Sequence, residues 1–140
     1  MIQYTYNDRR QLSLEGATTL GGNTDGSVRS IARVYDSLGR PTTNTSYSAS
    51  DGTGTVINQV VQSFADYGPV TTEWQSHAGA AVTSGQNQSP NVQYGFDTTA
   101  DGNGIYSNGL RLQTLTYPNS RCVGPASFEN PSEGETNPKE

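Results

Sequence analysis

Stretches rich in Tyr, Val, Thr and Phe follow one another along the first 120 residues, and polar clusters of Gly, Asn, Asp and Ser separate them. No long segment shows the 3.6-residue apolar period of an amphipathic helix. The residue types in the stretches favour a pleated, half-buried surface. The pattern predicts an all-β protein with strands over residues 2–7, 11–16, 28–35, 40–47, 55–64, 70–77, 91–96 and 110–117.

The clearest turn signal is Val-Tyr-Asp-Ser-Leu-Gly-Arg at positions 34–40. Asp36 stands where its carboxylate can accept hydrogen bonds from backbone N–H groups two residues on. The next two residues suit the centre of a type I turn, and Gly39 suits the left-handed conformation that rejoins a strand through a bulge. We therefore predict that Tyr35 ends one strand and that Arg40 begins its antiparallel partner.

Similar turns recur at a nearly constant interval, which predicts tandem hairpins. The first copy has Arg10 where the second has Gly39, and the third keeps Gly68 but has its acid one position later, at Asp66. In the fourth copy, Asp97 is followed by an insertion before the return strand. The aromatic residues that precede these turns are spaced 29, 29 and 32 residues apart, at Tyr6, Tyr35, Phe64 and Phe96.

These residues resemble the YD repeat of the RHS (rearrangement hotspot) family, whose signature is approximately aromatic-x-Tyr-Asp-x-x-Gly-Arg. The match is close over residues 34–40, and Tyr-Pro-Asn-Ser-Arg at 117–121 is similar to the opening of a further repeat. The resemblance implies tandem antiparallel β-hairpins that pair into one open, twisted and curled sheet. The residues that carry the structural motif are Tyr35, Asp36, Gly39, Arg40, Phe64, Gly68, Tyr94, Phe96 and Asp97.

In complete members of that family, many repeats spiral into a hollow shell, which encloses a toxin in bacterial polymorphic toxins. Related repeats occur in cell-surface proteins. Four hairpins are too few to close a shell, and the protease-like core segment that follows the repeats is not recognisable after Arg121. We therefore expect a fragment of such a repeat array, a truncated gene or a frame-shifted end.

Composition and charge exclude several classes of protein. Hydrophobic residues make up 31% of the 140 residues, and the formal net charge is −5. No run is apolar enough for a transmembrane helix, and no signal peptide is visible. The chain has no basic patch that would attract nucleic acid. The single cysteine, Cys122, permits neither an internal disulfide nor a cysteine-based zinc site.

Charge is distributed unevenly along the chain. Four of the six glutamates and the only lysine lie in residues 123–140, together with three of the seven prolines. A polar segment with so few large apolar side chains is not expected to fold alone. We therefore divide the chain into a β-hairpin array over residues 1–120 and a disordered acidic tail over residues 121–140.

Candidate catalytic and metal-binding residues are few. Ser76 and His77 are neighbours in a predicted strand, so they point to opposite faces and cannot form a nucleophile–base pair. We predict no enzymatic activity, no catalytic residue, no cofactor and no metal. Asp97 and Asp101 offer oxygen ligands for calcium, but they lack the EF-hand spacing, and turn chemistry explains them without a metal. Calcium binding there stays open.

Trp74, with Tyr67 near it in sequence, is a candidate platform for stacking against a sugar ring. The competing interpretation, which we favour, is that the indole packs across strands and stabilises the sheet. The first interpretation makes the protein a small β-rich carbohydrate-binding or adhesion module. The second is compatible with a purely structural role.

We therefore expect a non-enzymatic structural fragment of an RHS/YD-repeat scaffold, either on a cell surface or in a toxin-encapsulating shell. The carbohydrate-binding or adhesion module is the alternative. Expected partners are other YD repeats of a larger chain, or further copies of this chain through the sheet edges. We expect no nucleic acid and no membrane insertion. The resemblance implies a secreted or cell-surface location as part of a parent protein.

Overall fold

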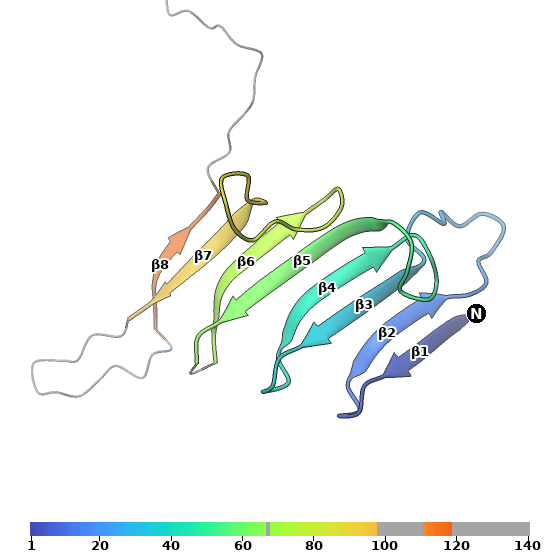
Figure 1. Ribbon diagram of the computed structural model, residues 1–140, viewed down its shortest axis with the longest axis horizontal. Helices are drawn as coiled ribbons and strands as arrows, with labels where there is room; N and C mark the ends of the chain where they lie inside the picture. Colours follow the sequence, from blue (N-terminus) through green and yellow to red (C-terminus); the bar gives the residue numbers. More distant parts are fainter. Residues whose placement is uncertain (67, 98–110, 119–140) are drawn as a thin grey trace, which may run out of the picture.

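The computed structural model describes residues 1–66, 68–97 and 111–118. These residues form eight antiparallel strands in one open sheet, in which the order of the strands follows the chain (Figure 1). The all-β hairpin array predicted from the sequence is confirmed, whereas the predicted tail over residues 121–140 lies outside the described residues. The strands are β1 Ile2–Tyr6, β2 Leu12–Ala17, β3 Ser30–Tyr35, β4 Pro41–Tyr47, β5 Val56–Phe64, β6 Val70–Ser76, β7 Asn91–Phe96 and β8 Leu112–Thr116.

Each odd-numbered strand makes a hairpin with the strand that follows it, and each hairpin closes on an aromatic residue. The aromatic residues that the sequence spaces at regular intervals are the last residues of β1, β3, β5 and β7. Their cross-strand partners are the first residues of β2, β4, β6 and β8. The four closing pairs are Tyr6–Leu12, Tyr35–Pro41, Phe64–Val70 and Phe96–Leu112.

A β-bulge lies directly after each closing pair, because the second strand has one residue more than the first at this point. The register moves from Tyr35–Pro41 to Val34–Thr43, which leaves Thr42 without a partner in the ladder. Such a bulge bends its strand and increases the local twist. Accordingly, β4 and its counterparts in the other hairpins curve where they leave their turns (Figure 1). The bulged residues are Ser13, Thr42, Thr71 and Gln113.

Successive hairpins join in one constant register. In the second strand of one hairpin, we count two residues on from the first residue. This residue pairs with the residue that lies three places before the closing aromatic residue of the next hairpin. The same rule holds at the β2–β3, β4–β5 and β6–β7 junctions. The three pairs are Leu14–Ala32, Thr43–Val61 and Thr72–Gln93.

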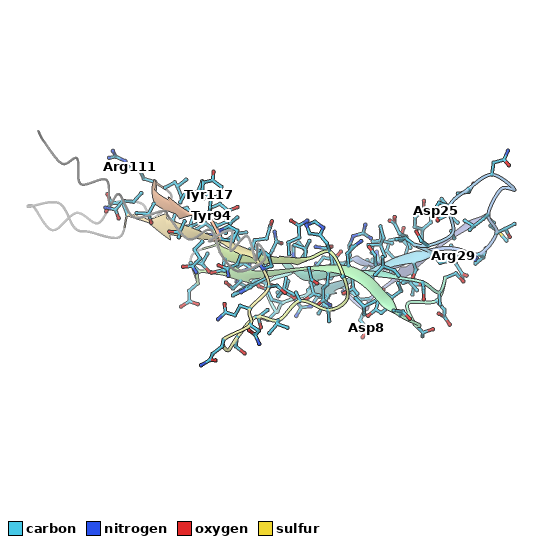
Figure 2. All side chains as sticks on the ribbon, turned by 90° about the horizontal axis from the view of Figure 1, so that it is seen from above. Asp8, Asp25, Arg29, Tyr94, Arg111 and Tyr117 are labelled. Carbon is cyan, nitrogen blue, oxygen red and sulfur yellow. The ribbon has the colours of Figure 1, made fainter. Side chains whose placement is uncertain are left out.

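The sheet is a single layer, so it encloses no apolar core (Figure 2). Among the described residues no apolar side chain is buried, and the buried polar side chains are Ser30 and Thr45, with exposed fractions of 3% and 4%. Both of these hydroxyl-bearing residues lie on the face that carries Leu14 and Gly16, as the cross-strand pairing shows. We call this the covered face, because two loops fold back onto it.

The first covering loop comprises residues 48–55. Ser30 Oγ donates a hydrogen bond to Ala49 O over 2.6 Å and accepts one from Gly52 N over 3.2 Å. Gly16 lies below Ser50 so closely that a Cβ at this position would overlap the Ser50 carbonyl oxygen. A glycine in β2 therefore makes room for this loop, and a serine in β3 holds it.

The second covering loop comprises residues 77–90. Gln59 connects it to the sheet, because its Oε1 accepts a hydrogen bond from Ala81 N over 2.9 Å. The Nε2 of the same residue donates to Thr45 Oγ1 over 2.7 Å, which satisfies that buried hydroxyl. The backbone adds a bond from Gly79 N to Ile57 O at 3.1 Å.

The opposite face, which we call the open face, carries Glu15, Ile31 and Arg33 in its first half. Glu15 and Arg33 form an ion pair with 3.2 Å between Oε2 and Nη2. Further along, Gln62 Nε2 donates to Glu73 Oε2 over 2.7 Å. This face therefore combines polar pairs with isolated aliphatic side chains.

Candidate functional site

The turns of the hairpins lie along one side of the sheet, at the ends of the strands, and we call this side the turn edge. It contains the motif predicted from the sequence. In the second turn, Asp36 Oδ1 accepts hydrogen bonds from Leu38 N and Arg40 N, each over 2.9 Å. Gly39 N donates to Asp36 O, and Asp36 N donates to Arg40 O. Gly39 has a φ of 85°, in the left-handed region. The predicted roles of the aspartate and the glycine are therefore both present.

The first turn repeats this geometry with different residues. Asn7 Oδ1 accepts from Arg9 N over 3.0 Å and from Gln11 N over 2.9 Å, as Asp36 does one repeat later. Arg10 takes the place of Gly39 and has a φ of 61°. It is the one non-glycine residue in the described part of the chain with a positive φ. The repeat therefore imposes a left-handed backbone even where the sequence provides no glycine.

The third turn keeps the backbone pattern, and the fourth hairpin keeps one of its hydrogen bonds. Ala65 N donates to Pro69 O, and Gly68, with a φ of 122°, donates its N–H to Ala65 O. In the fourth hairpin Asp97 N donates to Arg111 O over 2.9 Å, which reproduces the bond between Asp36 N and Arg40 O on either side of the insertion.

Arg40 connects neighbouring turns. Its Nε lies 2.6 Å from Asp36 Oδ2 in its own turn, and its Nη1 donates to Ala65 O of the next turn over 2.9 Å. Its guanidinium carbon also lies 4.6 Å from the centre of the Phe64 ring, a cation–π contact. Arg40 therefore contacts both the aspartate of its own turn and the backbone carbonyl of the next turn.

Gln11, at the position equivalent to Arg40, connects the first turn to the second. Its Nε2 donates to Gly39 O over 3.0 Å, and Arg9 Nη1 donates to Ser37 O beside it. Tyr35 completes the connection in the opposite direction, because its hydroxyl donates to Leu12 O over 2.8 Å. The turn edge is therefore a series of side chains that each bind the backbone of an adjacent hairpin.

The electrostatics of this edge follow from the same bonds. The backbone N–H of Arg40 is the main cause that lowers the pKa of Asp36 below its ordinary value of 3.8, and the Arg40 side chain and Leu38 N–H act in the same direction. Hydrogen bonds from Ser27 and Thr53 similarly lower the pKa values of Asp25 and Asp51. All three are turn carboxylates that are stabilised in their charged form.

The other candidate residues are dispersed. Trp74 is half-buried on the covered face opposite Val61, and its Nε1 donates to Gln88 Oε1 over 3.4 Å. Tyr67, its predicted partner in a sugar-binding platform, lies outside the described residues. His77 is exposed beyond the end of β6, and Ser76 Oγ donates to Ala78 O. Tyr94 is half-buried on the open face, opposite Leu115.

The calcium question concerns Asp97 and Asp101. Asp97 directly follows β7, whereas Asp101 lies outside the described residues. Among the residues that the structure describes, no group of three or more His, Cys, Asp or Glu side chains gathers where a metal would bind. The same part of the chain holds no helix long and apolar enough to cross a membrane.

The hydroxyl contacts at the bulges are a feature that sequence reasoning missed. The bulged residues Ser13 and Thr42 donate their hydroxyl hydrogens to carbonyls across the hairpin, at Thr5 O and Val34 O. Thr71 makes the equivalent contact to the Ser63 hydroxyl, at 2.8 Å. The 29-residue spacing of these hydroxyl residues is the signal that would have identified them.

Searches against protein-family models, curated proteins and solved structures find no match to this chain.

Proposed function

We propose that this chain is a non-enzymatic structural segment of an RHS/YD-repeat scaffold, which contributes hairpins to a larger β-sheet on a cell surface or around a toxin. The observation that carries this proposal is the constant register between hairpins, together with the same closing bulge in all four. Repeat proteins are stabilised by such identical neighbour interfaces, and their terminal repeats need a cover.

The chemistry of the turn edge supports a structural role. The Asp36 carboxylate accepts hydrogen bonds from its own turn, and the Arg40 guanidinium bridges to Ala65 O. Both groups are thus bound to backbone atoms of their own or the neighbouring turn. Arg40 also contacts the ring of Phe64, which aligns one hairpin with the next. Residues that align adjacent repeats are what a scaffold requires.

The coding sequence that flanks this segment in its source genome provides the direct test. We expect further Tyr-Asp-x-x-Gly-Arg motifs at intervals of about 29 residues on at least one side, in the same or a shifted reading frame. A chain extended by those hairpins should melt at a higher temperature, because each new neighbour interface adds stability. Flanks without any such motif in any frame would contradict the proposal.

A glycan array distinguishes the scaffold from a carbohydrate-binding module. The scaffold proposal expects no glycan to bind above background, for the parent chain and for Trp74→Ala alike. Binding that is lost in Trp74→Ala would instead favour the carbohydrate-binding alternative. Because Trp74 Nε1 already donates to Gln88 within the covering loop, we expect Trp74→Ala to affect mainly the stability of the sheet.

A further inference from the structure

The two edge strands of the sheet, β1 and β8, combine exposure with a lack of charge. Each has a single neighbour in the described sheet. Neither contains a charged residue or proline, whereas charged residues or proline occur in the inner strands β2, β3, β4 and β6. Charges and prolines are the features with which proteins usually prevent edge strands from pairing with other chains. These two edge strands therefore lack both of these features.

Most of the exposed large apolar side chains of the described residues lie at these edges. On β1, Ile2, Tyr4 and Tyr6 are 59%, 54% and 59% exposed. On β8 and just after it, Leu115 and Tyr117 are 40% and 68% exposed. Figure 2 shows Tyr117 at the end of the sheet that β8 forms. Burial of these side chains against a further strand would be favourable.

The two edges are also complementary in direction and register. Like β2, β4 and β6, β8 is the second strand of its hairpin, so its free side is the side on which those strands pair with the next hairpin. Like β3, β5 and β7, β1 is the first strand of its hairpin, so its free side is the side on which those strands pair with the preceding hairpin. Applied to β8 and a second β1, the constant register places Thr114 opposite Gln3 and Leu115 opposite Ile2. The last pair is apolar and lies on the open face, because Leu115 is opposite Tyr94.

In such a junction, Arg111 would add a polar contact at the end nearest the turns. It follows Asp97 across the fourth turn as Arg40 follows Asp36, and Arg40 donates to a carbonyl in the next turn, at Ala65. The guanidinium of Arg111 has no partner within the described residues. The carbonyl equivalent to Ala65 O in the first turn is that of Asn7, and in a second copy it would lie within reach of Arg111.

We propose that the β8 edge of one copy of this chain pairs with the β1 edge of a second copy, head to tail and antiparallel, with Leu115 opposite Ile2. This inference goes beyond the scaffold function, because it rests on the geometry of the sheet and concerns separate chains. A pairing of β1 with another β1 would be a new kind of junction, whereas β8 with β1 repeats a junction that the sheet already contains. A head-to-tail contact leaves one free edge at each end, so assembly continues beyond the dimer.

Sedimentation velocity over a concentration series tests the proposal on the full chain. We expect the parent chain to form dimers and larger species as the concentration rises, whereas Ile2→Lys and Leu115→Lys should each remain monomeric. Val82→Lys is the matched control, because Val82 is 48% exposed in a covering loop and lies on neither edge strand. It should assemble like the parent chain.

Mixing the two edge variants distinguishes the possible symmetries. Ile2→Lys retains an intact β8 edge and Leu115→Lys an intact β1 edge, so an equimolar mixture should form a one-to-one dimer and nothing larger. Dimerisation of Leu115→Lys alone would overturn the proposal in favour of β1–β1 pairing. A parent chain that remains monomeric at several hundred micromolar would overturn it entirely.

Disulfide trapping tests the register and does not depend on the lysine variants folding. In a Cys122→Ser background, a chain with Ile2→Cys is mixed with a chain with Leu115→Cys under oxidising conditions. Directly opposite residues in antiparallel strands lie within disulfide distance, and residues displaced by two positions lie further apart. Rapid cross-linking of this pair is expected, with slow cross-linking of Tyr4→Cys to Leu115→Cys. Equal rates for the two pairs, or no cross-link, would contradict the proposed register.

Discussion

The substitution Gly16→Ala, which adds a single methyl group, should detach loop 48–55 from the covered face of the sheet. A Cβ there would overlap the Ser50 carbonyl oxygen and lie 3.0 Å from the Ser50 carbonyl carbon. These are backbone atoms of loop 48–55, so rotation of a side chain cannot relieve the overlap. In Gly16→Ala the loop must therefore move away from β2, and the hydrogen bonds that Ser30 makes with Ala49 and Gly52 are lost.

The size of the effect follows from those two hydrogen bonds. Each contributes a net stability of about 1 kcal/mol, so the loss of both costs about 2 kcal/mol. Alanine is more favourable than glycine in a strand by about 0.5–1 kcal/mol, which offsets part of the loss. We expect Gly16→Ala to lower the free energy of unfolding by about 1–2 kcal/mol. For a domain of about 100 residues this lowers the melting temperature by about 4 °C or more.

Urea unfolding followed by far-UV circular dichroism measures the change, and hydrogen exchange at the Gly52 amide reports whether the loop has opened. Gly22→Ala is the control, since no atom lies within 4 Å of the position of its Cβ. It should leave the stability unchanged. A Gly16→Ala variant with the stability of the parent chain and a protected Gly52 amide would refute the packing argument.

Three further predictions concern the turn edge and the second covering loop. Arg10→Gly should stabilise the protein by about 0.5–1 kcal/mol in urea unfolding, because a non-glycine residue in the left-handed region costs about 1–2 kcal/mol and the greater freedom of glycine in the unfolded chain offsets part of that gain; an unchanged or lower stability would contradict this. The pKa of Asp36 is lower in the folded state than its ordinary value of 3.8. The ionised carboxylate therefore contributes its full stabilisation of the folded state above pH 3.8, and this stabilisation is lost as the pH falls through the folded-state pKa. Asp36→Asn introduces the residue found at the equivalent position, Asn7, and should fold at pH 7. In acid titrations followed by circular dichroism, its stability should fall less steeply with decreasing pH than that of the parent chain. An equally steep fall would show that Asp36 does not contribute to the acid sensitivity. Gln59→Ala should make loop 77–90 a preferred site of limited proteolysis, whereas cleavage no faster than in the parent chain would show that the other loop contacts suffice.

The strands and turns could be predicted because their determinants are local. Asp36 and Gly39 define a turn within a few residues, and the recurring aromatic residues fix where the hairpins close. The covering loops could not be predicted, because the contact of Ser30 with Ala49 joins residues 19 apart in sequence and depends on a glycine, Gly16, in a third segment. A glycine inside a strand indicates a close approach of other atoms, but it does not identify them.

The bridging contacts at the turn edge were predictable only in part. Arg40 has the charge and length to reach a neighbouring turn, so its contacts could be anticipated. Gln11 performs the same role in the first turn without any resemblance to the Gly-Arg signature. The geometry of the repeat fixes the position of this residue and leaves its chemistry free, so a motif-based search does not find it.

The strict chain order of the strands also has consequences for folding kinetics. Every strand contacts only the strands that precede and follow it in the sequence, so each hairpin can form without waiting for a distant segment. Closing short loops costs little entropy, and topologies with local contacts fold faster than sandwiches or barrels of similar size. The chain can thus add hairpins in the order in which they leave the ribosome, while its latest strand always remains a template for the next one.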